Sequence, residues 1–247
     1  MQSRLISIVI PSFNSECVIR RSVDSVLNQT YQDIELWVID DGSQDHTLDI
    51  LNSYNDPRLH IYALPNNTGS PAQPRNEGIS RATGKYIAFL DSDDYWEPNK
   101  LEIQLREMID AASPFSCTNY IVKAVNGAEH TRRVPRTSNF CETLALNKIG
   151  CSTVIIEKDL VTKYMFSDVR LEDYNLWLSI LKDGYSILGV EQCLMTYVQS
   201  NVSRSKFDLM QAKAYVDTFR RFGKPNLYSA LFHCCKYLLR RLVWARL

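Results

Sequence analysis

Short apolar segments alternate with amphipathic segments through the first hundred residues of the chain. Continuous runs rich in Ile and Val, typical of strands covered on both faces, occur at Leu5–Ile10, Ile34–Ile39, Leu59–Ala63 and Tyr86–Leu90. Helical periodicity lies between them, at Ser15–Asn28, Asp45–Tyr54 and Arg75–Ala82. This alternation requires right-handed crossovers and produces a mostly parallel sheet flanked by helices. We therefore predict an α/β fold with a Rossmann-like central sheet.

The second half of the chain is less regular. Its pattern predicts strands at Phe115–Val125, Thr153–Ile156 and Tyr185–Tyr197, and a helix at Asp173–Lys182. Two further helices, at Asp208–Phe222 and Leu227–Arg246, are separated by a Gly-Lys-Pro sequence that ends one helix and begins the next. The chain has no internal repeat. We predict one domain over residues 1–222 and a C-terminal helical appendage over residues 223–247.

Composition narrows the classes of function. The 28 basic and 28 acidic side chains balance among 247 residues, which argues against a nucleic-acid partner. The seven cysteines show no zinc-ligand spacing and are typical of a reducing compartment. The N-terminal apolar run is too short for a signal peptide, and no apolar stretch reaches the roughly 18 residues of a membrane span. We expect a cytoplasmic protein.

Polar residues follow each of the first four predicted strands. The four clusters are Pro11–Asn14, Asp40–Ser43, Asn66–Gly69 and Asp91–Asp94. In an open parallel sheet, ligands bind outside the carboxyl ends of the strands. The sequence therefore predicts a ligand site at this edge.

The acidic clusters have both structural and functional interpretations. Asp40–Ser43 is equally consistent with a turn that caps the following helix and with a contact to a ligand. Asp91–Asp94 places three carboxylates in four residues, whereas a cap needs one oxygen. Mutual repulsion favours a divalent cation, and Mg²⁺ or Mn²⁺ is typically held by one or two carboxylates together with ligand phosphates.

The first strand-to-helix turn contains no glycine, so neither a dinucleotide fingerprint nor a P-loop is present. Arg75 is then a candidate phosphate contact, or else a surface residue at a helix start.

Five motifs together resemble family 2 glycosyltransferases. They are Ile8–Asn14, Ile39–Thr47, Gly69–Gly78, Asp91–Asp94 and Leu171–Trp177, in the order and spacing of that family. The resemblance implies a GT-A fold, with a nucleotide-sugar half at about residues 1–112 and an acceptor half at about 113–205. It also implies an inverting transfer of a sugar from a nucleotide-diphosphate donor, expected to be UDP-linked, to a hydroxyl group.

The resemblance implies a role for each matching residue. The donor-binding set is Pro11, Ser12, Phe13, Asn14, Asp40, Asp41, Arg75, Asp91, Ser92 and Asp94. Pro11 and Phe13 would lie against the base and ribose, and Asp41 would accept a hydrogen bond from the base. Asp91 would face the ribose, and Asp94 would support the site or contact the sugar. Asp93 would ligate Mn²⁺ or Mg²⁺.

The same resemblance places the catalytic base in the last motif. Asp173 is the favoured base and Glu172 the second candidate, because a carboxylate must take the proton of the attacking hydroxyl. The alternative is that this pair only caps the following helix. Arg204, together with Lys206, would close over the diphosphate, although a solvated loop is equally consistent with that segment.

The C-terminal segment suggests a membrane partner. All acidic residues precede residue 218, whereas seven basic residues follow it. Apolar residues with helical spacing occur at Leu227, Leu231, Cys234, Leu238, Leu242 and Ala245. A basic amphipathic helix with aromatic side chains is typical of a membrane interface. We expect peripheral association with an anionic membrane, the inner face of the plasma membrane, and the alternative is packing on the protein's own core or on a second subunit in a homodimer.

The expected acceptor is a lipid-linked, lipopolysaccharide or polysaccharide glycan, and two other functions are kept as alternatives. A nucleotidyltransferase of similar architecture would need a glycine-rich first loop, which the chain lacks. A non-catalytic nucleotide-sugar-binding or scaffold module would not require both Asp93 and Asp173.

Overall fold

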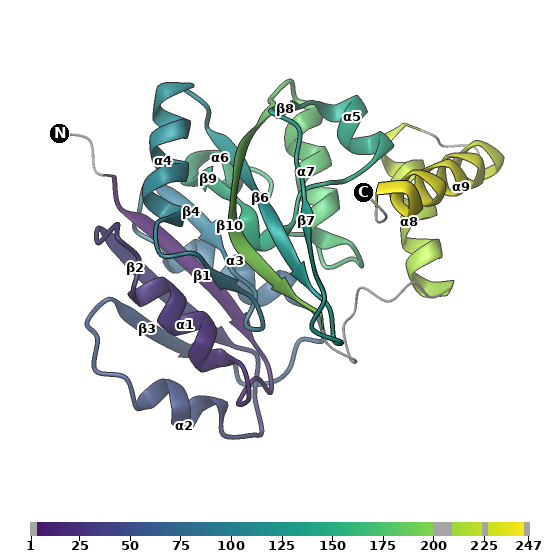
Figure 1. Ribbon diagram of the computed structural model, residues 1–247. Coiled ribbons are helices and arrows are strands. Elements are labelled where there is room, and N and C mark those ends of the chain that lie inside the picture. The colour runs from purple at the N-terminus through teal and green to yellow at the C-terminus, as the bar shows by residue number, and fades with distance from the viewer. Residues whose placement is uncertain (1–3, 200–208, 224–226, 245–247) are drawn as a thin grey trace.

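The computed structural model describes residues 4–199, 209–223 and 227–244 (Figure 1). Its sheet has the strand order β3-β2-β1-β4-β9-β6-β10-β5, with β7 paired to β6 and β8 to β10. The first four strands are parallel: β1 (Ile6–Ser12), β2 (Ile34–Asp40), β3 (Leu59–Ala63) and β4 (Tyr86–Phe89). The intervening helices are α1 (Ile19–Leu27), α2 (Thr47–Asn52) and α3 (Ala72–Arg81). The predicted α/β fold is confirmed.

The second half of the sheet is mixed. Strand β9 (Ile155–Glu157) lies antiparallel between β4 and β6 (Phe115–Lys123), and β10 (Ile187–Val198) runs parallel to β6. The sequence pattern did not predict the short elements, which are β5 (Tyr95–Trp96), β7 (Glu129–Arg132), β8 (Thr137–Ser138), α5 (Phe140–Ala145) and α6 (Lys158–Thr162). Helix α4 (Lys100–Asp110) follows β5 and leads into β6. The strand predicted from Thr153 begins at Ile155, because Cys151–Thr153 form a 3₁₀ turn, η1.

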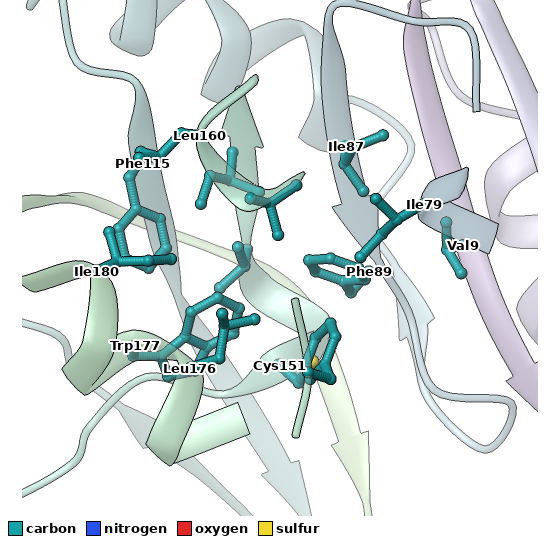
Figure 2. Close-up of a cluster of buried hydrophobic side chains, with 14 of the residues drawn as sticks. Val9, Ile79, Ile87, Phe89, Phe115, Cys151, Leu160, Leu176, Trp177 and Ile180 are labelled. Atoms are coloured by element: carbon teal, nitrogen blue, oxygen red, sulfur yellow. The ribbon is translucent and has the colours of Figure 1, made fainter. Parts of the chain in front are cut away.

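Two hydrophobic cores lie on opposite faces of the sheet. Alternation along β1 sends Val9 to one face and Ile8 and Ile10 to the other. Figure 2 shows the first core, in which Phe115 and Trp177 pack at 5.2 Å between ring centroids. The second core packs α1 and α4 against the opposite face. All seven residues of β1 are buried, so the strand that leads to the predicted ligand edge is held from both sides.

The C-terminal helices form a third cluster with α7 (Glu172–Lys182). Helix α8 (Leu209–Phe222) and helix α9 (Leu227–Trp244) lie side by side at one end of the molecule (Figure 1). The inward face of α9 carries Ala230, Cys234 and Tyr237, which are buried against residues of α7 and α8. This face of α9 therefore packs on the protein's own core. The domain boundary at residue 222 stays a prediction, although this cluster extends across it.

Among the residues described here, no helix combines the length and the apolar character that crossing a bilayer requires. All seven cysteines are free thiols, in line with the usage expected from the sequence.

Helix α3 approaches β1 closely at Gly78. A Cβ atom at this position would lie 2.4 Å from Cγ1 of Val9 and 2.9 Å from its Cγ2. We expect Gly78→Ala to destabilise the protein by about 1–3 kcal/mol, because the buried Val9 must shift, and to lower Tm by roughly 2–4 °C for each kcal/mol. In Gly78→Ala/Val9→Ala the clashing atoms are removed, so the two effects on Tm should be less than additive. An unchanged Tm in Gly78→Ala would contradict this packing argument.

Candidate active site

The carboxyl ends of β1, β2 and β4 open into one cleft of about 1400 Å³. Its wall contains most of the predicted site residues: Pro11, Ser12, Phe13, Asn14, Asp41, Arg75, Asp91, Ser92, Asp93, Asp94, Glu172 and Asp173. Pockets for one small ligand usually measure roughly 300–1,000 Å³. The cleft thus has room for two substrates. Arg204 lies outside the described residues.

The turn after β1 forms one end of the cleft. Asn14 has a left-handed backbone, with φ of 46°. Its side-chain oxygen accepts a hydrogen bond from the Gln44 amide at 2.8 Å, and its own amide donates to Oγ of Ser43 at 2.9 Å. These contacts fix the turn, while the Phe13 side chain is 45% exposed. An exposed aromatic ring on a fixed turn offers a flat face to a planar ligand.

The two aspartates after β2 have different surroundings. Asp40 is fully buried and accepts hydrogen bonds from the amide and the hydroxyl of Ser43, at 2.9 and 2.5 Å. It stabilises the turn and is not part of the cleft wall. Asp41 does line the cleft, and it accepts hydrogen bonds from the Thr68 amide and hydroxyl at 3.0 Å. The structure therefore brings only Asp41 of this pair to the site.

Asp94 supports the loop that follows β4, residues Asp91–Asp94, which we call the acidic loop. One carboxylate oxygen accepts a hydrogen bond from Oγ of Ser152 at 2.6 Å, and the other accepts from the Val198 amide at 3.1 Å. Ser152 also accepts from the Asp91 amide at 3.1 Å. Because Asp94 is 1% exposed and both of its oxygens are engaged, its contacts favour the supporting role over a sugar contact.

Asp93 and Asp91 present carboxylates to the cleft from the same loop. Burial, followed by the negative charge of Asp91, raises the pKa of Asp93 to about 6. In the described part of the chain, no three or more His, Cys, Asp or Glu side chains are arranged to hold a metal ion. Mg²⁺ or Mn²⁺ typically needs only one or two carboxylates when phosphates complete its coordination. The carboxylate of Asp93, which lines the cleft beside the charge of Asp91, fits that requirement, whereas the engaged oxygens of Asp94 do not.

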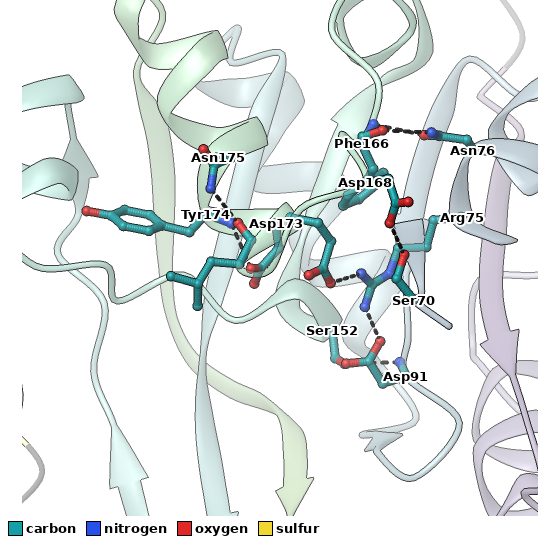
Figure 3. Close-up of polar contacts among 12 residues, drawn as sticks. Ser70, Arg75, Asn76, Asp91, Ser152, Phe166, Asp168, Asp173, Tyr174 and Asn175 are labelled. Carbon is teal, nitrogen blue, oxygen red and sulfur yellow. Dashed lines mark hydrogen bonds and ion pairs between the residues drawn. The ribbon is translucent and has the colours of Figure 1, made fainter. Parts of the chain in front are cut away.

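Arg75 joins the acidic loop to the start of α7 (Figure 3). Its guanidinium donates to Oδ1 of Asp91 at 2.6 Å and to Oε1 of Glu172 at 2.7 Å, and the residue is only 3% exposed. Arg75 therefore neutralises two carboxylates. Arg75 also lines the cleft, and its expected contact with a phosphate stays a prediction.

Helix α7 begins with two carboxylates, Glu172 and Asp173. Arg75 forms its ion pair with Glu172 and not with Asp173. Asp173 lines the cleft half-buried, and one oxygen accepts a hydrogen bond from the Tyr174 amide at 2.7 Å. Burial, followed by the charge of Glu172, raises the pKa of Asp173 to about 7, while Arg75 opposes this rise. A pKa near the working pH is the property that a general base needs. The geometry thus distinguishes Asp173 from Glu172.

The structure adds residues to which the sequence analysis gave no role. Ser152 forms hydrogen bonds to both Asp91 and Asp94 of the acidic loop. Tyr215 and Tyr237 of the C-terminal helices line the cleft. The Asn76 side chain forms hydrogen bonds with the backbone amide and carbonyl of Phe166, beside Arg75. Asn76 stands inside a recognised motif and could have been suspected, whereas Ser152 and the two tyrosines show no pattern in sequence.

Comparison with known proteins identifies relatives along the whole chain. The glucosyltransferase WfgD of Escherichia coli, named UDP-Glc:alpha-D-GlcNAc-diphosphoundecaprenol beta-1,3-glucosyltransferase, is 38% identical over 242 residues, which cover 97% of this chain and 94% of WfgD. Among solved structures, TarS of Staphylococcus aureus in complex with UDP-GlcNAc matches with a TM-score of 0.73 and 22% identity, over 88% of this chain and 65% of that one. A mannosyltransferase of Pyrobaculum calidifontis in complex with GDP-Man and Mn²⁺ matches with a TM-score of 0.65 and 18% identity, over 98% of this chain and 76% of that one.

These two structures share the GT-A-like fold of this chain, which the sequence motifs led us to expect. The sequence model of glycosyl transferase family 2 matches residues 7–157, the part of the chain that carries β1 to β9 and the acidic loop. This match covers more than half of the chain and agrees with the full-length similarity to WfgD. The chain therefore belongs to glycosyl transferase family 2.

Proposed function

We propose that this glycosyltransferase moves a sugar from a UDP-sugar to a hydroxyl group of a lipid-linked glycan, with inversion at the anomeric carbon. The observation that carries the proposal is the state of Asp173, a half-buried carboxylate in the cleft wall with a pKa raised to about 7. The donor and acceptor classes are supported by the name of WfgD, to which nearly the whole chain is similar.

The proposed reaction is a single displacement. The acceptor hydroxyl transfers its proton to Asp173 while its oxygen bonds to the anomeric carbon, and the bond from that carbon to the diphosphate oxygen breaks on the opposite face. UDP leaves with the bonding electrons, so the configuration at the anomeric carbon is inverted. Asp93 is the residue that would hold Mn²⁺ or Mg²⁺, and the bound ion would supply Lewis-acid stabilisation to the charge on the leaving diphosphate.

A transfer assay tests the proposed function. The protein is incubated with Mn²⁺, UDP-glucose and a synthetic α-GlcNAc-diphosphate carrying a short alkyl chain, and both UDP and the glycosylated lipid are measured. We expect acceptor-dependent UDP release and a product with the inverted anomeric configuration by NMR. A nucleotide-sugar-binding module would show thermal stabilisation by a UDP-sugar, about 2.7 kcal/mol at 100 times Kd, without product. A nucleotidyltransferase would instead release pyrophosphate from a nucleoside triphosphate and a sugar phosphate.

We further propose that the outer face of α8 and α9 binds an anionic membrane, where a lipid-linked acceptor resides. Large apolar side chains are exposed on these helices at Leu209, Met210, Tyr228, Leu231, Phe232 and Leu239. Exposed basic residues accompany them at Arg220, Arg221, Lys236 and Arg240. Anionic lipid attracts such basic side chains by about 1 kcal/mol each. Because Cys234 and Tyr237 point inward, the proposed contact face is narrower than the amphipathic pattern predicted.

Vesicle co-sedimentation tests this face. We expect the protein to sediment with phosphatidylglycerol vesicles, less so at high salt, and Phe232→Ser/Leu239→Ser to weaken binding several-fold, because apolar burial contributes about 25 cal/mol per Å². Val125→Ser, which changes a 59% exposed side chain in another part of the molecule, is the matched control and should bind as the wild type does. A protein that stays in the supernatant, for example as a soluble homodimer, would contradict the membrane proposal.

A further inference from the structure

The segment that leads into α7 is bracketed by two unusual backbone conformations. Met165 and Leu171 have φ of 51° and 65°, in the left-handed region that glycine favours. Such a conformation is strained for a residue with a side chain, and it persists only where surrounding contacts hold it. Glu172 and Asp173 follow Leu171 directly, so the conformation of residues 165–171 sets where α7 begins.

The contacts that hold this segment come from α3 and the turn before it (Figure 3). The Asn76 side chain donates to the Phe166 carbonyl at 2.8 Å, and its oxygen accepts from the Phe166 amide at 2.8 Å. The hydroxyl of Ser70 donates to Asp168 at 2.8 Å. With the ion pair of Arg75 and Glu172 at 2.7 Å, the segment is held near both ends and in the middle.

Helix α3 is a rigid support for these contacts. Its Gly78 packs against Val9 so closely that a Cβ atom would not fit. Phe166 itself is 4% exposed, and its ring meets Phe89 edge-on at 5.2 Å and Trp177 at 6.2 Å. The Asn76 side chain binds both the amide and the carbonyl of Phe166, so it restrains the position and the orientation of this residue together.

We propose that Asn76 is a positioning residue for the transfer reaction, whose two hydrogen bonds to Phe166 hold residues 165–171 in the conformation that presents Asp173 to the acceptor hydroxyl. The inference rests on the proposed function, in which Asp173 is the base. Asn76 belongs to α3, in the predicted nucleotide-sugar half, and precedes Asp173 by 97 residues, so in this proposal an element of the donor half positions the base of the acceptor half. A misplacement of about 1 Å at a reacting group can cost roughly 100-fold in rate.

The variant Asn76→Ala tests the proposal, with Asn119→Ala as the matched control. Asn119 on β6 also forms two hydrogen bonds from its side chain to the backbone. It donates to the Glu191 carbonyl and accepts from the Val134 amide at 2.7 Å. We expect kcat of Asn76→Ala to fall by about 10–100-fold, while Kd for UDP-glucose, measured by calorimetry, stays within about twofold. Asn119→Ala should keep the kcat of the wild type. Asn76→Asp retains the acceptor and loses the donor, so its kcat should lie between those of wild type and Asn76→Ala.

Amide hydrogen exchange supplies a readout that does not need activity. Exchange of residues 163–172 should accelerate in Asn76→Ala and stay unchanged in Asn119→Ala. A wild-type kcat in Asn76→Ala, an equal loss in both alanine variants, or unchanged exchange would each overturn the positioning role. If the wild-type protein transfers no sugar, the proposed function fails instead, and the exchange result alone then decides whether Asn76 restrains the segment.

Discussion

Replacing Asp173 with asparagine should lower turnover by roughly 10²–10⁴-fold, because an amide cannot take the proton of the attacking hydroxyl. The amide oxygen can still accept the hydrogen bond from the Tyr174 amide, so the start of α7 should persist. We therefore expect the affinity for the UDP-sugar to stay close to that of the wild type. Steady-state kinetics and donor binding, measured on the same preparation, separate the two effects.

The pH dependence gives an independent check on Asp173. The pKa of its carboxyl is raised to about 7, and the deprotonated form is the active base. The wild-type rate at saturating substrates should therefore increase as the pH rises through about 7 and then level off. The residual rate of Asp173→Asn should lack this increase.

Asp183→Asn is the matched control for this change, because Asp183 is an exposed carboxylate at the other end of α7. It should keep the wild-type rate and pH profile. If Glu172→Gln loses turnover and Asp173→Asn retains it, the base is Glu172, and the ion pair with Arg75 would have to open during the reaction.

Replacing Asp93 with alanine should reduce transfer by at least about 10³-fold and weaken donor binding. Lewis-acid stabilisation of the leaving diphosphate contributes several kcal/mol, and each 1.36 kcal/mol corresponds to about tenfold in rate. Burial, followed by the charge of Asp91, raises the pKa of Asp93 to about 6, so a cation beside this carboxylate would relieve a concentration of negative charge. Mn²⁺-dependent donor binding, followed by calorimetry, measures the loss directly.

The control for Asp93→Ala is Asp110→Ala, which removes an exposed carboxylate at the end of α4. It should leave transfer and Mn²⁺ dependence unchanged. Full wild-type activity in excess chelator, or a fully active Asp93→Ala, would exclude a metal requirement at this loop.

The sequence predicted the first four strands and their helices within a few residues, because each repeats a local pattern of apolar side chains. It did not predict β5, β7 and β8, which have two to four residues each. Strands of this length exist because a distant partner supplies their hydrogen bonds, as when Met195 of β10 pairs with Trp96 of β5. The local periodicity of apolar side chains carries no information about such a partner, so it does not predict these short strands.

Local sequence pattern also does not report the distant contacts that distinguish two adjacent candidate residues within the site. By resemblance, the sequence analysis gave Asp41 the contact with the base and favoured Asp173 over Glu172 as the catalytic base, but local pattern supplied no physical reason for either choice. Asp40 is withdrawn from the cleft by its bonds to Ser43, and Glu172 is engaged by Arg75, which lies 97 residues earlier in the chain. The inward face of α9 was likewise decided by its contacts with α7 and α8.

The sequence by itself determined the alternating architecture, the polar edge at the strand ends and the acidic loop at Asp91–Asp94, because these depend on residues close together in the chain. The tertiary structure decided which of those carboxylates remain available for chemistry. A carboxylate loses its availability when a donor from elsewhere in the chain occupies its oxygens, as Ser152 and Val198 do for Asp94. Burial and neighbouring charge set the pKa of those that are left, and both arise only when the distant segments have packed together.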